Sequence, residues 1–159
     1  MAEDNKFTSP EAHKFLGIEF NMKVWDLLGK ANRTDEEDQA MIHAAHASHC
    51  HWSYVGTSVH TTRGEWLISH VYAVLGRAEP ALYHSKRCLQ VCLDHHIADF
   101  DLAYGYESMA RALAADGNLP EAGRYYSLAK EAGEAIKDPD AKKFFVGDFG
   151  TGPWYGLEQ

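Results

Sequence analysis

The sequence predicts an all-α protein, and three observations support this prediction. Apolar residues recur mostly at spacings of three and four, strict alternation of apolar and polar residues is scarce, and Ala and Leu are abundant between the breaks. Clusters that contain Gly or Pro divide the 159 residues into about seven segments. The short connections between these segments are typical of antiparallel helical hairpins.

Helix-end signals bound the first two segments. Ser9 and Pro10 begin the first helix, because Ser is a favoured N-cap and Pro suits the first helical position, and Gly29 ends it. Thr34 begins the second helix with a glutamate three residues later, which is the spacing of a capping box. We therefore expect a first hairpin over residues 9–54.

Two further hairpins follow, and each has a glycine in its central turn. The first covers residues 62–96 and turns at Gly76, and the second covers residues 99–137 and turns at Gly117. A shorter seventh helix, which begins with an Asp-Pro pair, is expected at 138–146 and would cap the array.

The predicted domain organisation is one helical domain followed by a tail. Residues 1–146 form the domain, because a chain of this length buries a single core without disulfides or metals. Residues 147–159 contain too many glycines for a helix and are expected to form the tail. Its Trp154 and Tyr155 need an apolar surface, either on the same chain or on a second copy in a homodimer.

Composition and charge exclude several classes of function. The chain has 15 Lys and Arg against 23 Asp and Glu, and its formal net charge of −8 disfavours nucleic acids and anionic membranes as partners. The first residues lack the basic start and apolar stretch of a secretory signal, and no apolar stretch is long enough to span a membrane. With three cysteines, an odd number, these features predict a cytoplasmic protein with reduced thiols.

The hairpins at 62–96 and 99–137 share one pattern of large and small side chains. The fifth residue after each turn glycine is alanine, the fourth residue before it is large and apolar, and the twelfth after it is small. Small residues let two helices approach closely, and glycine permits the positive φ of the turn. The chain therefore contains a repeated helical hairpin.

This pattern resembles the tetratricopeptide repeat family. The matching residues of the second repeat are Tyr106, Met109, Ala110, Leu113, Gly117, Ala122, Tyr126 and Ala129. Those of the first repeat are Ile68, Ser69, Tyr72, Gly76, Ala81 and Cys88. The resemblance covers residues 62–137, leaves the hairpin at 9–54 as a divergent one, and extends in overall character to small bacterial members of this class. It implies a short right-handed array of hairpins.

The resemblance implies a function in binding, with no cofactor and no reaction. Proteins of this family hold proteins or peptides in a concave groove lined by the first helix of each hairpin, so the chain would be an adaptor or scaffold. The residues expected to line the groove, carried over by position, are Arg63, Trp66, His70, Tyr104, Glu107 and Arg111. The arginines can clamp a carboxylate while the rings hold an apolar group. Alternatively, the arginines are solvated or paired with Glu107, and Trp66 belongs to the core.

A histidine-rich segment at 43–51 suggests a different function, in metal binding. His43, His46 and Cys50 fall on one face of the expected helix. Three such donors can hold one transition metal ion, Zn, Ni or Cu, with an open position, as in a metal carrier or a small metal-dependent helical enzyme. The competing interpretation is that these histidines pack inside a hairpin with hydrogen bonds to a neighbouring helix, since no recognised metal motif is present.

A second row of donor side chains steps by four residues along the fourth expected helix. It contains His84, Cys88, Cys92 and His96. Cys88 stands at the small-residue position of the repeat, and a histidine at a helix end complements the helix dipole, so packing is favoured over metal binding here. The chain also lacks a strand followed by a glycine-rich loop and lacks the G-x-S-x-G motif, which argues against the common enzyme classes.

Overall fold

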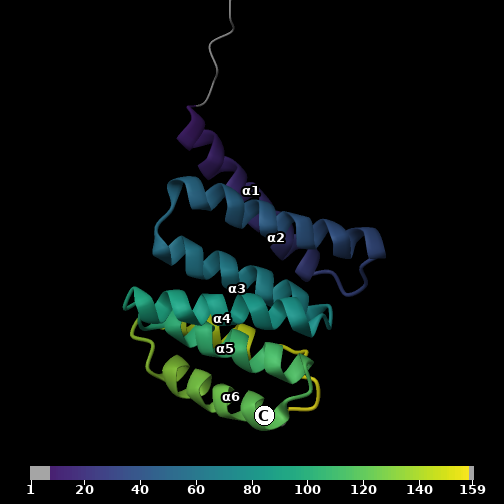
Figure 1. Cartoon of the computed structure of the whole chain (residues 1–159), viewed down its shortest axis with the longest axis vertical. Coiled ribbons are helices and arrows are strands. Elements are labelled where there is room, and N and C mark those ends of the chain that lie inside the picture. The colour runs from purple at the N-terminus through teal and green to yellow at the C-terminus, as the bar shows by residue number, and fades with distance from the viewer. Residues whose placement is uncertain (1–7, 158–159) are drawn as a thin grey trace, which may run out of the picture.

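The computed structural model describes residues 8–157, and within this range the chain forms seven α-helices and no strand. The helices are α1 (Ser9–Leu28), α2 (Asp35–Val55), α3 (Ser58–Val74), α4 (Ala78–Asp94), α5 (Phe100–Ala115), α6 (Leu119–Glu134) and α7 (Pro139–Phe149). Figure 1 shows α1 to α6 following one another along the long axis of the molecule. The predicted all-α class is confirmed. Residues 1–7, part of the start that lacks the features of a secretory signal, and the last two residues of the predicted tail lie outside the described range.

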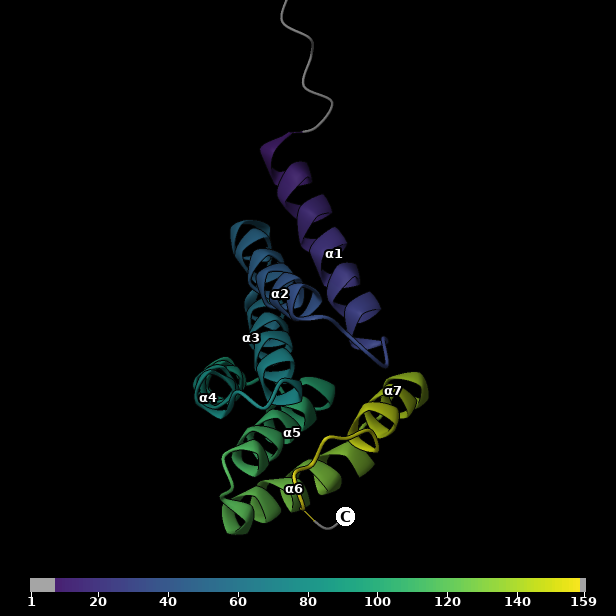
Figure 2. The same ribbon diagram turned by 90° about the vertical axis from the view of Figure 1, so that its right-hand side faces the viewer.

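The helices pack as successive hairpins. α1 pairs with α2, α3 with α4, and α5 with α6, while α2 contacts α3, α4 contacts α5, and α3 also contacts α5 directly. The last helix, α7, packs on α5 and α6. In Figure 2, the lower end of α1 and the upper end of α7 lie on the same side of the layer that α3 and α5 form. This side is called the inner side below.

Capping boxes begin the first two helices. Thr34 caps α2 as predicted: its hydroxyl accepts from the Glu37 amide at 3.2 Å, and the Glu37 carboxylate accepts from the Thr34 amide at 3.0 Å. For α1 the cap is Thr8 and not the predicted Ser9. The reason is the same reciprocal pairing, here between Thr8 and Glu11, which places Ser9 and Pro10 inside the first turn.

The two hairpin turns share their backbone geometry. Gly76 has φ of 70° and Gly117 has φ of 81°, values in the left-handed region that favours glycine. In each turn the amide of the next residue donates to the carbonyl five residues back, at 2.9 and 3.0 Å, as in a Schellman motif. The small residues expected to let the helices approach are buried, among them Ala81 and Ala122. The repeated pattern of the sequence thus corresponds to a repeated local structure.

Two helices differ in length from the expectation. α3 begins at Ser58, before the expected start at Thr62, because the His60 ring accepts a hydrogen bond from the Thr57 amide at 3.0 Å and so caps an earlier turn. α7 runs to Phe149, beyond the expected end at residue 146. The additional turn is stabilised by packing, since the Phe149 ring stacks on Tyr126 of α6 at 4.4 Å between centroids. No helix within the described range has both the length and the apolar character needed to cross a membrane.

Candidate functional site

Three of the six residues predicted for the groove form a buried cluster between α3 and α5. The Trp66 indole N–H donates to Oε2 of Glu107 at 2.7 Å, and Nε of Arg111 donates to Oε1 of the same carboxylate at 2.6 Å. The side chains of Arg111 and Glu107 are 1% and 0% exposed. The arginine is thus paired with Glu107 inside the protein, and the cluster holds the two helices together.

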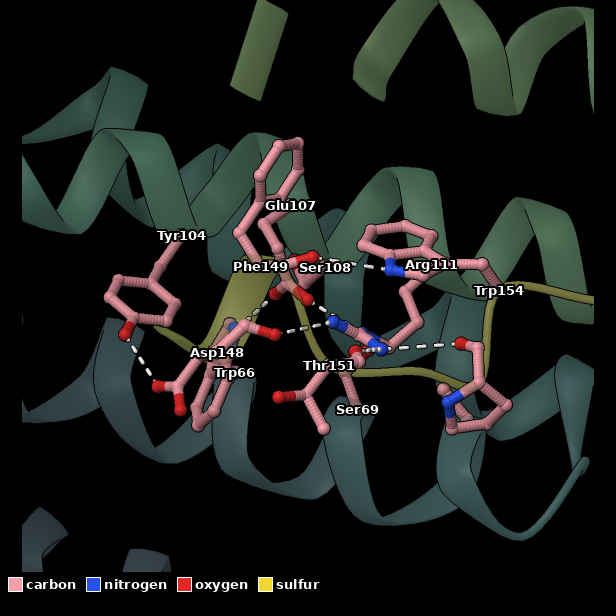
Figure 3. Close-up of polar contacts among 12 residues, drawn as sticks. Trp66, Ser69, Tyr104, Glu107, Ser108, Arg111, Asp148, Phe149, Thr151 and Trp154 are labelled. Atoms are coloured by element: carbon pink, nitrogen blue, oxygen red, sulfur yellow. Dashed lines mark hydrogen bonds and ion pairs between the residues drawn. The ribbon is translucent and has the colours of Figure 1, made fainter. Parts of the chain in front are cut away.

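The chain's own C-terminal segment covers this cluster. Arg111 donates from Nη1 to the carbonyls of Thr151 and Pro153, at 2.8 and 3.2 Å, and from Nη2 to the carbonyl of Asp148 at 3.2 Å (Figure 3). Its guanidinium also lies 4.1 Å from the centroid of the Trp154 ring. The sequence left open whether Trp154 and Tyr155 pack on the same chain or on a second copy, and in the structure they pack on the same chain.

Further contacts fix this segment, residues 150–157, along the later half of α5. The Trp154 ring is buried, and its indole N–H donates to the Phe149 carbonyl at 3.2 Å. The Tyr155 hydroxyl donates to the carbonyl of Ala73, and Leu157 packs against the apolar residues that join α5 and α6. The end of the inner side around Arg111 is therefore filled by protein.

The other end of the inner side contains an open cavity of about 500 Å³ between α1, α3, α5 and α7. A volume of this size is common for ligand sites. Five aromatic side chains line it, namely those of Trp25, Trp66, Phe100, Tyr104 and Phe144. The sequence-predicted residues Trp66 and Tyr104 thus line this cavity, together with Arg63 at its edge.

The rings of the wall pack on one another. Trp25 of α1 stacks on Trp66 of α3 with 6.0 Å between centroids, and Trp66 meets Tyr104 of α5 edge to face at 5.0 Å. Phe100 meets Tyr104 in the same manner at 4.8 Å. Such arrangements are favoured by the ring quadrupoles and hold the rings in place. Four of the five rings of the wall are therefore held in position by one another.

Two carboxylates and one arginine line the cavity. Arg63 donates to both carboxylate oxygens of Asp101, at 2.7 and 3.1 Å, and this hydrogen bonding raises the pKa of Arg63. Asp148 of α7 accepts a hydrogen bond of 2.6 Å from the Tyr104 hydroxyl. Burial raises the pKa of Asp148 and also raises the pKa of Tyr104. Within the described residues, Asp101 has an arginine partner and the carboxylate of Asp148 has none.

His70 lies beside the cluster and takes no part in its hydrogen bonds. Its ring stacks on Trp66 with 4.7 Å between centroids. Nδ1 of this histidine is buried and has no hydrogen-bond partner within residues 8–157. Burial, together with the nearby charge of Arg111, lowers the pKa of His70 to about 3, so the ring is neutral near pH 7.

The histidine-rich segment lies on α2, away from this cavity. His43, His46 and Cys50 are exposed, and Nε2 of His46 lies 3.1 Å from the Tyr72 hydroxyl of α3. Although the residue is exposed overall, its ring packs against the rings of Tyr72 and His84, and this partial burial, together with the nearby His84, lowers the pKa of His46. In the part of the chain that the structure describes, no group of three or more His, Cys, Asp or Glu side chains is placed to hold a metal ion.

Several of the remaining donors take part in structural clusters. Glu65 is buried in α3 and accepts hydrogen bonds from Arg87 at 2.8 Å and from Nδ1 of His84 at 2.6 Å, and Nε2 of His49 lies 3.4 Å away. Burial alone would raise the pKa of Glu65, but these partners outweigh it and lower the pKa. The buried thiols of the second row, Cys88 and Cys92, contact the Thr62 hydroxyl at 3.3 and 3.1 Å.

Sequence reasoning missed the α7 part of the cavity. Phe144 and Asp148 are four residues apart and so share a face of α7, which is the signal that would have found them. Because the sequence predicts that this helix ends at residue 146, Asp148 falls outside the predicted helix.

Comparisons with protein families, with curated proteins and with solved structures found no match for this chain. The geometry of the cavity is therefore the basis for assigning a function.

Proposed function

We propose that this protein is a binding module that receives part of a partner polypeptide in the cavity between α1, α3, α5 and α7. The observation that carries the proposal is the cavity itself: it measures about 500 Å³, five aromatic side chains line it, and none of the residues of the C-terminal segment does. Aromatic pockets of this kind hold the anchoring side chains of binding partners.

The apolar surface continues from the cavity along α1. Ile18, Met22 and Trp25 follow one another at helical spacing on one face, and they are 41%, 55% and 41% exposed. Trp25 also lines the cavity. A small molecule would occupy the cavity alone, whereas an extended or helical segment of a polypeptide would cover this neighbouring surface as well. The tetratricopeptide resemblance of the sequence implies the same class of ligand.

Selection from a displayed library of random peptides on the intact protein tests this proposal. The enriched peptides would then be measured by fluorescence anisotropy against wild type and Phe144→Glu, which places a charge in the aromatic wall. Phe144 is 71% exposed, so the fold should tolerate the change. We expect binding to weaken about tenfold or more, as for the loss of an aromatic contact at the centre of an interface.

Val146→Glu is the matched control for this experiment. Val146 lies on the same helix, is 57% exposed and does not line the cavity. The added charge is the same in both variants, so the peptides should bind Val146→Glu as they bind wild type. Peptides that bind all three proteins equally, or a library that yields no binder sensitive to Phe144→Glu, would contradict the proposed site.

A further inference from the structure

The charges in the cavity leave one carboxylate uncompensated. Asp101 and Arg63 neutralise each other through two hydrogen bonds. Asp148 receives one hydrogen bond from the neutral Tyr104 hydroxyl, and Arg111, the cation behind it, donates to the backbone carbonyl of Asp148 and to the Glu107 carboxylate. The described side chains of the lining therefore carry a formal charge of −1, located on a half-buried group.

A half-buried carboxylate with a single neutral donor favours a cation as its partner. Burial disfavours the ionised form of Asp148, and the negative charge of Glu107 adds to this effect; the hydrogen bond from Tyr104 and the charge of Arg111 oppose it without outweighing it, so the pKa of Asp148 is raised. A neutral ligand would remove water from Asp148 without replacing it by a countercharge, which is costly. An anionic ligand would meet direct repulsion unless Arg63 left Asp101.

The remaining wall of the cavity suits a cation as well. Five aromatic rings line the space, and the faces of such rings attract cations through their quadrupoles. The edge of the cavity already contains one contact of this kind, between the Arg63 guanidinium and the Phe100 ring at 5.6 Å. The net charge of −8 adds a long-range attraction for cations.

We infer that the cavity binds an organic cation, an alkylated ammonium or a guanidinium, with its charge facing Asp148 and its surface enclosed by the aromatic rings. The inference rests on the proposed function, because the cation would be the anchoring side chain of the partner, a lysine, methylated lysine or arginine. A free organic ammonium compound has the same chemistry, and the experiment below separates the two sources.

The test compares choline with 3,3-dimethylbutan-1-ol, which has the same shape but no charge. Both are titrated into the full-length protein, and the indole N–H signals of Trp25 and Trp66 are followed by NMR. We expect choline to bind at least about fivefold more tightly than the uncharged compound. Equal binding of the two, or no change in either signal up to the highest choline concentration, would overturn the inference.

Asp148→Asn identifies the carboxylate that meets the cation. The amide oxygen still accepts from Tyr104, so the structure should be kept while the charge is lost. Choline binding should weaken about fivefold or more, and binding of the uncharged compound should not change. Asp140→Asn, at an exposed position of the same helix, removes the same charge from the protein and should leave both compounds unaffected. An equal loss of choline binding in both variants would refute the role of Asp148.

A second variant guards against a folding defect in Asp148→Asn. Phe144→Leu keeps an apolar wall at a largely exposed position but removes one ring. Choline binding should weaken in this variant while binding of the uncharged compound is kept, and a parallel loss of both would contradict the aromatic enclosure.

Peptides separate the source of the cation and keep the two proposals distinguishable. If the peptides selected on the protein share a Lys or Arg and lose binding when it becomes norleucine, the cation is a side chain of the partner. If choline binds but no peptide does, the inference about the cavity stands and the proposed polypeptide partner fails. If peptides bind in a manner that depends on Phe144 but without any basic residue, the proposed function stands and the inference fails.

Discussion

Arg111 shows how a residue expected to meet a ligand can instead hold the protein together. Its charge is buried and satisfied by Glu107, by the Asp148 carbonyl of α7 and by two carbonyls of the C-terminal segment. Arg111→Met would leave Glu107 buried without a countercharge. Breaking such a pair costs about 3–5 kcal/mol, so we expect the free energy of unfolding in urea to fall by this amount.

The double variant Glu107→Gln with Arg111→Met is the control for this prediction. It removes both charges and keeps an oxygen that accepts the Trp66 indole N–H. Because no uncompensated charge remains, it should regain a substantial part of the lost stability. A single Arg111→Met variant as stable as wild type would show that the pair contributes nothing to the fold.

His70 gives the protein a predictable sensitivity to acid. Its pKa is lowered to about 3 in the folded state, against about 6.5 for an unfolded chain, so between these values the unfolded state binds more protons. Stability should therefore decrease as the pH falls below about 6.5, by up to about 1.4 kcal/mol per pH unit from this residue. His70→Phe keeps a ring against Trp66 and removes the titration.

Urea unfolding at pH 7 and pH 5 measures this effect. His46, whose pKa is also lowered, contributes to the loss in both proteins, while Glu65, whose pKa is lowered from 4.5, loses its contribution only at more acidic pH. The decrease in stability between the two pH values should be smaller in His70→Phe than in wild type. An identical decrease would mean that His70 is protonated freely in the folded protein.

At the scale of single elements, the sequence correctly predicted those helix ends that depend on residues only a few positions away. The capping box at Thr34 and the turn glycines Gly76 and Gly117 depend on residues within a few positions, and the structure confirms them. The predicted end of α7 was wrong because tertiary packing sets the end of this helix. Phe149 stacks on a ring of α6, and this contact outweighs the low helix propensity of the glycine at position 147. Because the predicted helix ended before Asp148, the sequence did not indicate that this carboxylate lines the cavity.

Two helical glycines test the role of close packing between α6 and α7. A Cβ on Gly133 would overlap the Phe145 ring, whereas a Cβ on Gly147 would have no atom within 4 Å. Gly133→Ala should lower the melting temperature and displace α7, and so weaken binding in the cavity, as overpacking typically costs about 1–3 kcal/mol. Gly147→Ala should be neutral or stabilise by up to about 1 kcal/mol, since alanine is the better helix former. Similar melting temperatures for the two variants would contradict this packing.

For α2, the metal alternative stays a prediction. His43, His46 and Cys50 lie on the exposed side of the helix, so an ion could reach them without disturbing the core. Elemental analysis of untagged protein purified without chelator would support the alternative if about one equivalent of Zn, Ni or Cu were found and were lost in His43→Ala with His46→Ala. Folded protein free of metal would leave His46 as a hydrogen-bond partner of Tyr72.

At the scale of the whole molecule, the C-terminal segment divides the inner side into a closed and an open part. The sequence indicated that Trp154 and Tyr155 need an apolar surface, but helical periodicity carries no information on where an irregular segment packs. The contact depends on residues far apart in the chain, such as Arg111 with the Thr151 carbonyl and Tyr155 with that of Ala73. The sequence therefore did not predict that the C-terminal segment covers the end around Arg111. The cavity is the part of the inner side that this segment does not cover.

Removing residues 151–159 tests whether this segment is part of the fold. The truncated chain would leave Arg111 without two carbonyl acceptors and expose the surface that Trp154 and Leu157 cover. We expect a clearly lower melting temperature, because buried polar groups without partners cost about 1–3 kcal/mol each. A synthetic peptide of residues 151–157, added in excess, should raise the melting temperature again by mass action, and the same peptide with Trp154 replaced by Ala should not. A truncated chain that melts like the full-length protein would mean that the segment lies on a core already complete without it, and the closed end of the inner side would then be open to ligands as well.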